Sequence, residues 1–219
     1  MSSTYTAERV IPLYATITGV GVGLTGLRLW VRTSYARTAI AADDIMAVAA
    51  AVFVCAATGM QIANAVLGTA GNDVMTADTA RRARTALKIN WLNPVLSPWA
   101  FGSIKLSLAL FYRRIFGVSP HFRAANNAAI ALTAAYAVAF SLAQLFLCGA
   151  RFGLIWLRLD QQPARDRCAE RGALQFAYAL VSVATDVLVV GLPLVFLPRI
   201  QMPTRKKWAT AFVFALGFA

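Results

Sequence analysis

The chain has 219 residues, of which 59% are hydrophobic and 14% are charged, and its formal net charge at pH 7 is +12. The mean hydropathy of +0.62 lies outside the range of ordinary soluble domains and indicates an all-α, polytopic membrane protein. The 21 Lys and Arg residues are scattered between apolar runs and form no single basic face, so we expect the lipid bilayer as a partner and no nucleic acid.

The apolar runs predict a bundle of five full transmembrane helices, at 10–31, 45–67, 91–112, 128–147 and 172–197. A last apolar run, 208–219, would reach only about 18 Å as a helix, which is short of a bilayer core. We therefore expect the chain to stop within a sixth span and to be a fragment of a longer protein. Because no repeat of fixed period and no linker occurs, residues 1–219 are counted as a single multi-pass domain.

The first two expected helices carry two local signals. Gly19 and Gly23 have the spacing that lets helices approach closely, and we expect them to pack inside the bundle rather than to form a dimer interface. Asp43 and Asp44 begin the second helix, where carboxylates cap free N–H groups and meet the favourable end of the helix dipole. The alternative is a catalytic acid pair, but no second acidic stretch exists to complete a magnesium–diphosphate site.

Lys105 and Asp186 are the two charges well inside the expected spans. At helical rise they lie about 12 Å and 16 Å from the same interface, so a lysine side chain can bridge the difference in depth. An unpaired charge at that depth costs several kcal/mol, which predicts a direct or water-bridged pair between the third and fifth helices. The alternative has Lys105 extending toward Asp44 or the headgroups, with Asp186 protonated.

The three cysteines and the single histidine suggest a disulfide and no metal site. Cys148 and Cys168 bracket a polar segment, and we predict that they form a disulfide closing a loop of about 20 residues, with two free thiols as the alternative. Cys55 is expected to be a buried apolar thiol. His121 is expected in a solvated loop, and it has no second ligand at metal-binding spacing.

Basic residues orient the bundle only weakly, because each side carries ten Lys and Arg. Those on one side lie in short loops next to helix ends, where the positive-inside rule has force, and the cysteine pair needs an oxidising compartment on the other side. Both arguments place the N-terminus outside.

Several motifs, each weak alone, follow one another in a specific order. They are Arg28-x-x-x-Arg32, Asp43-Asp44, Lys105-Leu-Ser107, Phe111-Tyr-Arg113-Arg-Ile-Phe116, Cys148 with Trp156 and Cys168, Asp186 with Pro193, and Lys207 before Phe214-Ala-Leu-Gly217-Phe218. In this order the chain resembles the fungal rhodopsin-domain family of integral membrane proteins over nearly its whole length. The resemblance implies a seven-helix, receptor-like architecture, and some members of the family stand beside secondary-metabolite genes. The resemblance does not license a retinal chromophore, because the seventh helix, where retinal proteins carry their Schiff-base lysine, is missing and Lys105 is not in the corresponding place. We expect no cofactor.

Two functional classes follow from these observations. The favoured one is a receptor-like sensor in the plasma membrane rather than the endoplasmic reticulum, with a small lipophilic or extracellular ligand and a cytosolic signalling partner. The alternative is a membrane-embedded enzyme or accessory protein of terpenoid or polyketide biosynthesis, with Asp186 or Asp44 as proton donor. An enzyme of that kind should show a closed lipophilic pocket around an acid, whereas a receptor should show an outward-facing pocket.

Overall fold

The computed structural model describes residues 7–35, 39–66, 79–116, 119–147 and 171–196. Helices account for almost all of these residues: α1 (Ala7–Trp30), the π-helical turn η1 (Val31–Tyr35), α2 (Ala42–Val66), α3 (Thr79–Phe116), α4 (Pro120–Leu145) and α6 (Arg171–Phe196). No strand occurs in this part of the chain, which confirms the all-α fold class.

Four segments of these helices are long and apolar enough to cross a membrane: Ala42–Val66, Lys88–Arg114, Pro120–Leu145 and Gly172–Pro193. α1 has 24 residues, and its length at helical rise is about 36 Å; as a membrane span it stays a prediction. The expected partial span 208–219 lies outside the described residues and also stays a prediction.

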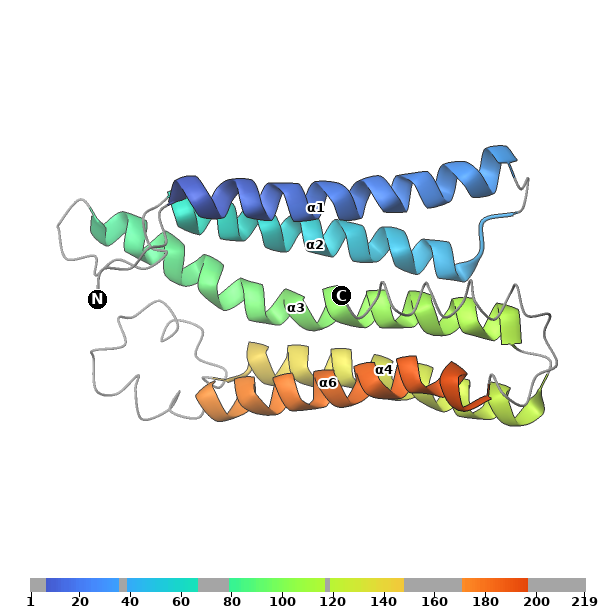
Figure 1. Cartoon of the computed structure of the whole chain (residues 1–219). Helices are drawn as coiled ribbons and strands as arrows, with labels where there is room; N and C mark the ends of the chain where they lie inside the picture. The colour runs from blue at the N-terminus through green and yellow to red at the C-terminus, as the bar shows by residue number, and fades with distance from the viewer. Residues whose placement is uncertain (1–6, 36–38, 67–78, 117–118, 148–170, 197–219) are drawn as a thin grey trace.

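α3 runs through the middle of the bundle (Figure 1). It packs most extensively against α2 and α4, while α1 rests on α2, and α6 rests on α4 and, over a smaller area, on α3. The bundle is therefore arranged as α1 and α2 on one side of α3, and α4 and α6 on the other (Figure 1). Polar side chains on different faces of α3 meet different neighbours.

α3 is bent, and it is closely packed in the stretch that contains its prolines. Pro94 and Pro98 lie inside the helix and Pro98 is fully buried. Figure 1 shows that α3 is bent, as is typical of helices that contain proline. One turn after Pro98, a Cβ at Gly102 would lie only 3.0 Å from the Cβ of Ala137 on α4. The absence of a side chain at Gly102 therefore permits the close approach of α3 and α4.

α4 begins eight residues before the predicted start at 128. Pro120 occupies the first turn, where its fixed φ suits a helix and its missing N–H costs nothing. The following polar stretch is helical because two of its side chains are buried on α3. Phe122 packs edge-on against Phe116 at 5.6 Å between ring centroids, and Asn126 Nδ2 donates to the carbonyl oxygen of Ala109 at 2.9 Å.

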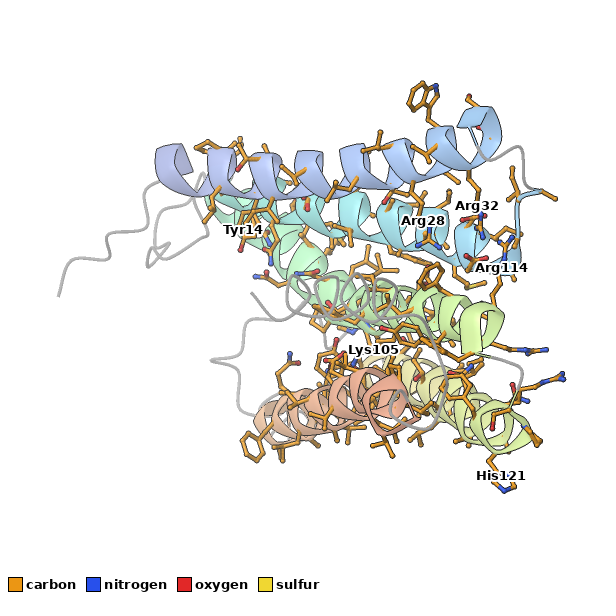
Figure 2. The ribbon with its side chains drawn as sticks, turned by 45° about the vertical axis from the view of Figure 1, so that its right-hand side comes forward. Tyr14, Arg28, Arg32, Lys105, Arg114 and His121 are labelled. Atoms are coloured by element: carbon orange, nitrogen blue, oxygen red, sulfur yellow. The ribbon has the colours of Figure 1, made fainter. Side chains whose placement is uncertain are left out.

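Three smaller expectations are corrected by the structure. His121 lies in the first turn of α4 rather than in a loop, and its exposed ring points away from the bundle (Figure 2). Cys55 is exposed rather than buried, because no other described helix covers its face of α2. A Cβ at Gly19 or Gly23 would meet no atom within 4 Å, so the described residues do not form the close helix contact expected there.

Candidate functional site

The structure brings Lys105 of α3, which is labelled in Figure 2, to Asp186 of α6. The distance between Nζ and Oδ1 is 3.2 Å. The ammonium also donates to the backbone oxygen of Ser182 at 2.8 Å, to its hydroxyl at 3.0 Å and to the hydroxyl of Thr185 at 2.9 Å. The Lys105 side chain is only 3% exposed, whereas that of Asp186 is 54% exposed. Lys105 therefore neither reaches the headgroups nor points toward Asp44, which was the alternative.

The groups around Lys105 provide hydrogen-bond acceptors for its buried ammonium in place of water. Its three N–H donors face four acceptors, and the ring of Tyr136 lies 5.1 Å from Nζ, within the range of a cation–π interaction. Sequence reasoning missed Ser182 and Thr185. Spacing could have revealed Ser182, because it lies four residues before Asp186 and therefore shares its helix face. Thr185 directly precedes Asp186, so the same rule does not point to it.

A second polar cluster, the arginine–aspartate quartet, consists of Arg28, Arg32, Asp43 and Asp44, where α1 and η1 lead into α2. Arg28 Nη2 lies 2.8 Å from Asp43 Oδ2, and Arg28 Nε lies 3.4 Å from Asp44 Oδ1. Arg32 Nη1 lies 2.9 Å from Asp43 Oδ2 and also pairs with Asp44. Both aspartates are almost completely buried. They are thus neutralised inside the bundle and are not available as exposed acids.

The expected capping role is present alongside these ion pairs. Asp44 Oδ2 accepts the backbone N–H of Ala41 at 3.1 Å, as in one half of a capping box, and Ser107 on α3 donates to the backbone oxygen of Asp43 at 2.8 Å. Burial disfavours the charge on Arg32, but its hydrogen bonds to Asp44 and Asp43 outweigh this effect and raise the pKa of the guanidinium. The ion pairs of the quartet and the Ser107 hydrogen bond join the start of α2 to α1 and α3.

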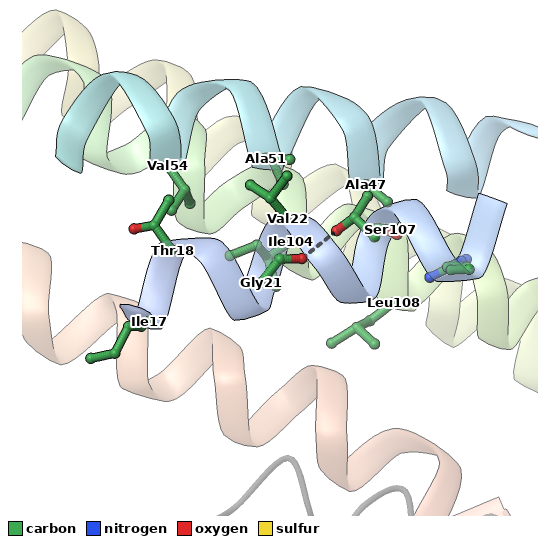
Figure 3. Close-up of a pocket in the computed structure, with 13 residues that line it drawn as sticks. Ile17, Thr18, Gly21, Val22, Ala47, Ala51, Val54, Ile104, Ser107 and Leu108 are labelled. Atoms are coloured by element: carbon green, nitrogen blue, oxygen red, sulfur yellow. Dashed lines mark hydrogen bonds between the residues drawn. The ribbon is translucent and has the colours of Figure 1, made fainter. Parts of the chain in front are cut away.

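A pocket of about 360 Å³ lies between α1, α2 and α3 and ends at the quartet (Figure 3). Its walls are mainly apolar and include Ile17, Val22, Ala51, Val54, Ile104 and Leu108. Its polar lining consists of Arg28 and the hydroxyls of Thr18, Thr25 and Ser107. None of the three aspartates of the two clusters lines it. The volume is within the usual range for small-molecule sites, about 300–1,000 Å³.

The structure does not describe the remaining predicted site residues. Cys148 and Cys168 lie outside the described residues, so their disulfide stays a prediction. Within the described residues no group of three or more His, Cys, Asp or Glu side chains could hold a metal ion.

The family model of the Fungal rhodopsin domain matches residues 27–219. The chain belongs to this family. With the four helices able to span a membrane, membership makes it a multi-pass membrane protein. No solved structure matches the chain.

Two similar proteins come from fungi. Phomoidride biosynthesis cluster protein H of Fungal sp. (strain ATCC 74256) is 30% identical over 113 residues, which are 50% of this chain and 38% of that protein. Satratoxin biosynthesis SC1 cluster protein 4 of Stachybotrys chartarum is 27% identical over 114 residues, 52% of this chain and 41% of that protein. The aligned stretch thus spans about two-fifths of the length of the curated relatives that it matches.

The family name raises the question of a retinal chromophore, and the described residues do not fit one. A Schiff base needs a lysine nitrogen that is free to bond covalently to the chromophore. Lys105, the buried lysine of the described part, has its nitrogen engaged with four oxygen atoms on α6 and does not line the pocket.

Proposed function

We propose that this member of the fungal rhodopsin-domain family is a receptor-like sensor that binds a small lipophilic molecule inside the membrane. The observation that carries the proposal is the pocket between α1, α2 and α3, which is apolar along its walls and polar at the end next to the quartet. A membrane-embedded enzyme that used an acid would need that acid unpaired and facing its substrate. Asp43 and Asp44 are paired with arginines and Asp186 with Lys105, and none lines the pocket, which supports binding over proton transfer.

Figure 2 shows Arg32, Arg114 and His121 at the same end of the bundle. Arg113 adjoins Arg114, Arg123 follows His121 by two residues, and both arginines are exposed. With the N-terminus outside, this basic end would face the cytosol and a signalling partner there, and the plasma membrane would be the location that gives the sensor access to extracellular ligands. These exposed arginines support the proposed orientation through the positive-inside rule.

The binding proposal can be tested by filling the pocket. A panel of lipophilic fungal metabolites is screened for molecules that raise the melting temperature of the protein in nanodiscs, and hits are recovered and checked for chemical change. Gly21 lines the pocket and has open space at its Cβ position, so Gly21→Leu should remove the stabilisation by every hit. Gly23 also has open space but does not line the pocket, so Gly23→Leu is the matched control and should keep the response. Equal responses in the two variants, or no stabilising molecule in the panel, would contradict the proposal.

The second candidate is an accessory protein or enzyme of secondary-metabolite biosynthesis. It is favoured by the names of the two relatives, both of which are biosynthesis cluster proteins. Deletion of the gene followed by metabolite profiling separates the two candidates. Loss of one product together with accumulation of its precursor would favour the biosynthetic role, whereas an unchanged metabolite profile with a lost response to a bound molecule would favour the sensor.

A further inference from the structure

The polar end of the pocket contains Arg28, whose Nη1 donates no hydrogen bond within the described residues and whose guanidinium carbon lies 5.5 Å from the centroid of the Phe111 ring. Arg28 lines the pocket, and its side chain is 34% exposed. Its contacts with Asp43 and Asp44 use Nη2 and Nε, and no hydrogen bond to Nη1 occurs among the described residues. A guanidinium has five N–H donors and no acceptor. Any ligand group next to Arg28 must therefore accept a hydrogen bond.

The hydroxyls that line the pocket have little left to donate. Thr25 donates its proton to the carbonyl oxygen of Gly21 at 2.9 Å, and Ser107 donates to that of Asp43 at 2.8 Å. Thr18, toward the far end of the pocket, shares a hydrogen bond with Thr58 at 2.7 Å. A hydroxyl that has donated its only proton still has acceptor capacity. A ligand oxygen can thus accept from Arg28 and, if it carries a proton, donate to Thr25 or Ser107.

The net charge of the quartet indicates whether the pocket favours a ligand with a charged or an uncharged head group. The formal charges of its two guanidinium groups and two carboxylates sum to zero, so the quartet has no excess positive charge to attract an anionic ligand. Burying an ionised group without a counter-charge costs several kcal/mol in a membrane interior. A cationic head would in addition lie beside Arg28. An uncharged ligand oxygen can accept a hydrogen bond from Arg28 without the cost of burying an ion and without placing a positive charge next to the guanidinium.

We infer that the pocket binds an uncharged oxygenated lipophile, such as an alcohol, ketone or lactone, with its oxygen at Arg28 and its hydrocarbon body against the apolar walls of α1, α2 and α3. This inference rests on the proposed function and narrows its ligand class. Bilayer lipids also carry neutral ester oxygens, so the test is run in phospholipid nanodiscs, where lipid is already in large excess and only a preferred ligand adds saturable binding.

The test uses four probes with the same twelve-carbon chain length: 2-dodecanone, 1-dodecanol, dodecanoate and dodecylammonium. Nanodiscs carrying the full chain are equilibrated with each probe at about pH 9, where a carboxylic acid is ionised and most of an amine is still protonated. Bound probe is measured by mass spectrometry, with empty nanodiscs subtracted. We expect saturable binding of the ketone and the alcohol, at least about tenfold tighter than that of either ion, which corresponds to about 1.4 kcal/mol. Gly21→Leu should abolish this binding and Gly23→Leu should preserve it.

The outcomes separate this inference from the proposed function. If dodecanoate or dodecylammonium binds as tightly as the neutral probes, and Gly21→Leu still removes the binding, the neutral ligand class is wrong while a lipophile-binding pocket stands. If no probe binds saturably, the inference is overturned, and the proposed function then depends on the metabolite panel alone. Binding that is equal in both leucine variants would show probe partitioning into lipid and would overturn the inference as well.

Discussion

Lys105 is surrounded by more acceptor atoms than it has protons, whereas its carboxylate partner Asp186 remains half exposed on α6. The pair is therefore asymmetric. Without Lys105, Asp186 would lose its counter-charge and the Ser182 and Thr185 oxygens would lose their donor; without Asp186, the ammonium would keep three acceptors. We interpret the pair first as a clamp between α3 and α6, because use as a switch would need a second state.

A double-mutant cycle tests this asymmetry. Lys105→Met should lower the free energy of unfolding, because it leaves Asp186 without its counter-charge and the Ser182 and Thr185 oxygens without their donor, and Asp186→Asn should lower it by less, because the ammonium keeps three acceptors. The loss in the double variant should differ from the sum of the single losses by about 1–3 kcal/mol. Unfolding in detergent micelles provides the measurement, with Arg113→Met, at an exposed position, as the control. Additive losses would show that the two charges do not interact and would leave Asp186 as a candidate acid for the biosynthetic alternative.

At the scale of elements, two contacts determine how the helices are joined. The quartet fastens the end of α1 to the start of α2, and Ser107 extends this contact to α3. On the opposite side of α3, Gly102 allows α4 to come close. The first contact depends on ion pairs and a hydrogen bond, the second depends on the missing side chain of a glycine, and neither depends on a large apolar side chain.

Gly102→Ala tests the contact between α3 and α4. The added Cβ would lie 3.0 Å from the Cβ of Ala137, which is fixed to the backbone, so a helix has to shift. We expect the free energy of unfolding to fall by about 1–3 kcal/mol, as in other overpacked sites. Gly59→Ala on α2 is the matched control, because a Cβ there meets no atom within 4 Å, and its stability should be unchanged or slightly higher. If both variants unfold at the same denaturant concentration, the close approach does not exist in the membrane.

For the whole molecule, the central position of α3 places the ligand pocket and the Lys105 cluster on two faces of one helix. Ile104, Ser107 and Leu108 line the pocket, whereas Lys105 contacts α6. A ligand that displaced α3 would therefore act both on the arginine–aspartate quartet, which contacts α3 through Ser107, and on the contacts of Lys105 with α6. This arrangement is the structural basis on which a sensor could pass ligand binding from the α1–α2 side to the α4–α6 side.

The predicted disulfide concerns the topology of the whole chain. A Cys148–Cys168 bond would close a loop of about 20 residues and contribute roughly 3 kcal/mol, and it would require that loop to face an oxidising compartment. Mass spectrometry of the protein, alkylated without reduction, should find these two thiols joined. Cys55, which is exposed, should be alkylated and serves as the internal control. Recovery of Cys148 and Cys168 in alkylated form would remove the disulfide and part of the argument for an external N-terminus.

The sequence by itself determined the class of molecule, because long apolar runs can satisfy their backbone hydrogen bonds in a bilayer only as helices. It also indicated Lys105 and Asp186 as partners, since unpaired charges at similar depth are too costly to leave apart. It did not reveal the early start of α4, because residues 120–127 look polar and their helicity depends on Phe122 and Asn126 meeting α3. The tertiary structure alone decided that Arg28 and Arg32 neutralise Asp43 and Asp44, and that a pocket ends beside them. Those contacts join residues on different helices, and hydrophobic periodicity along one helix carries no information about which neighbour its faces will meet.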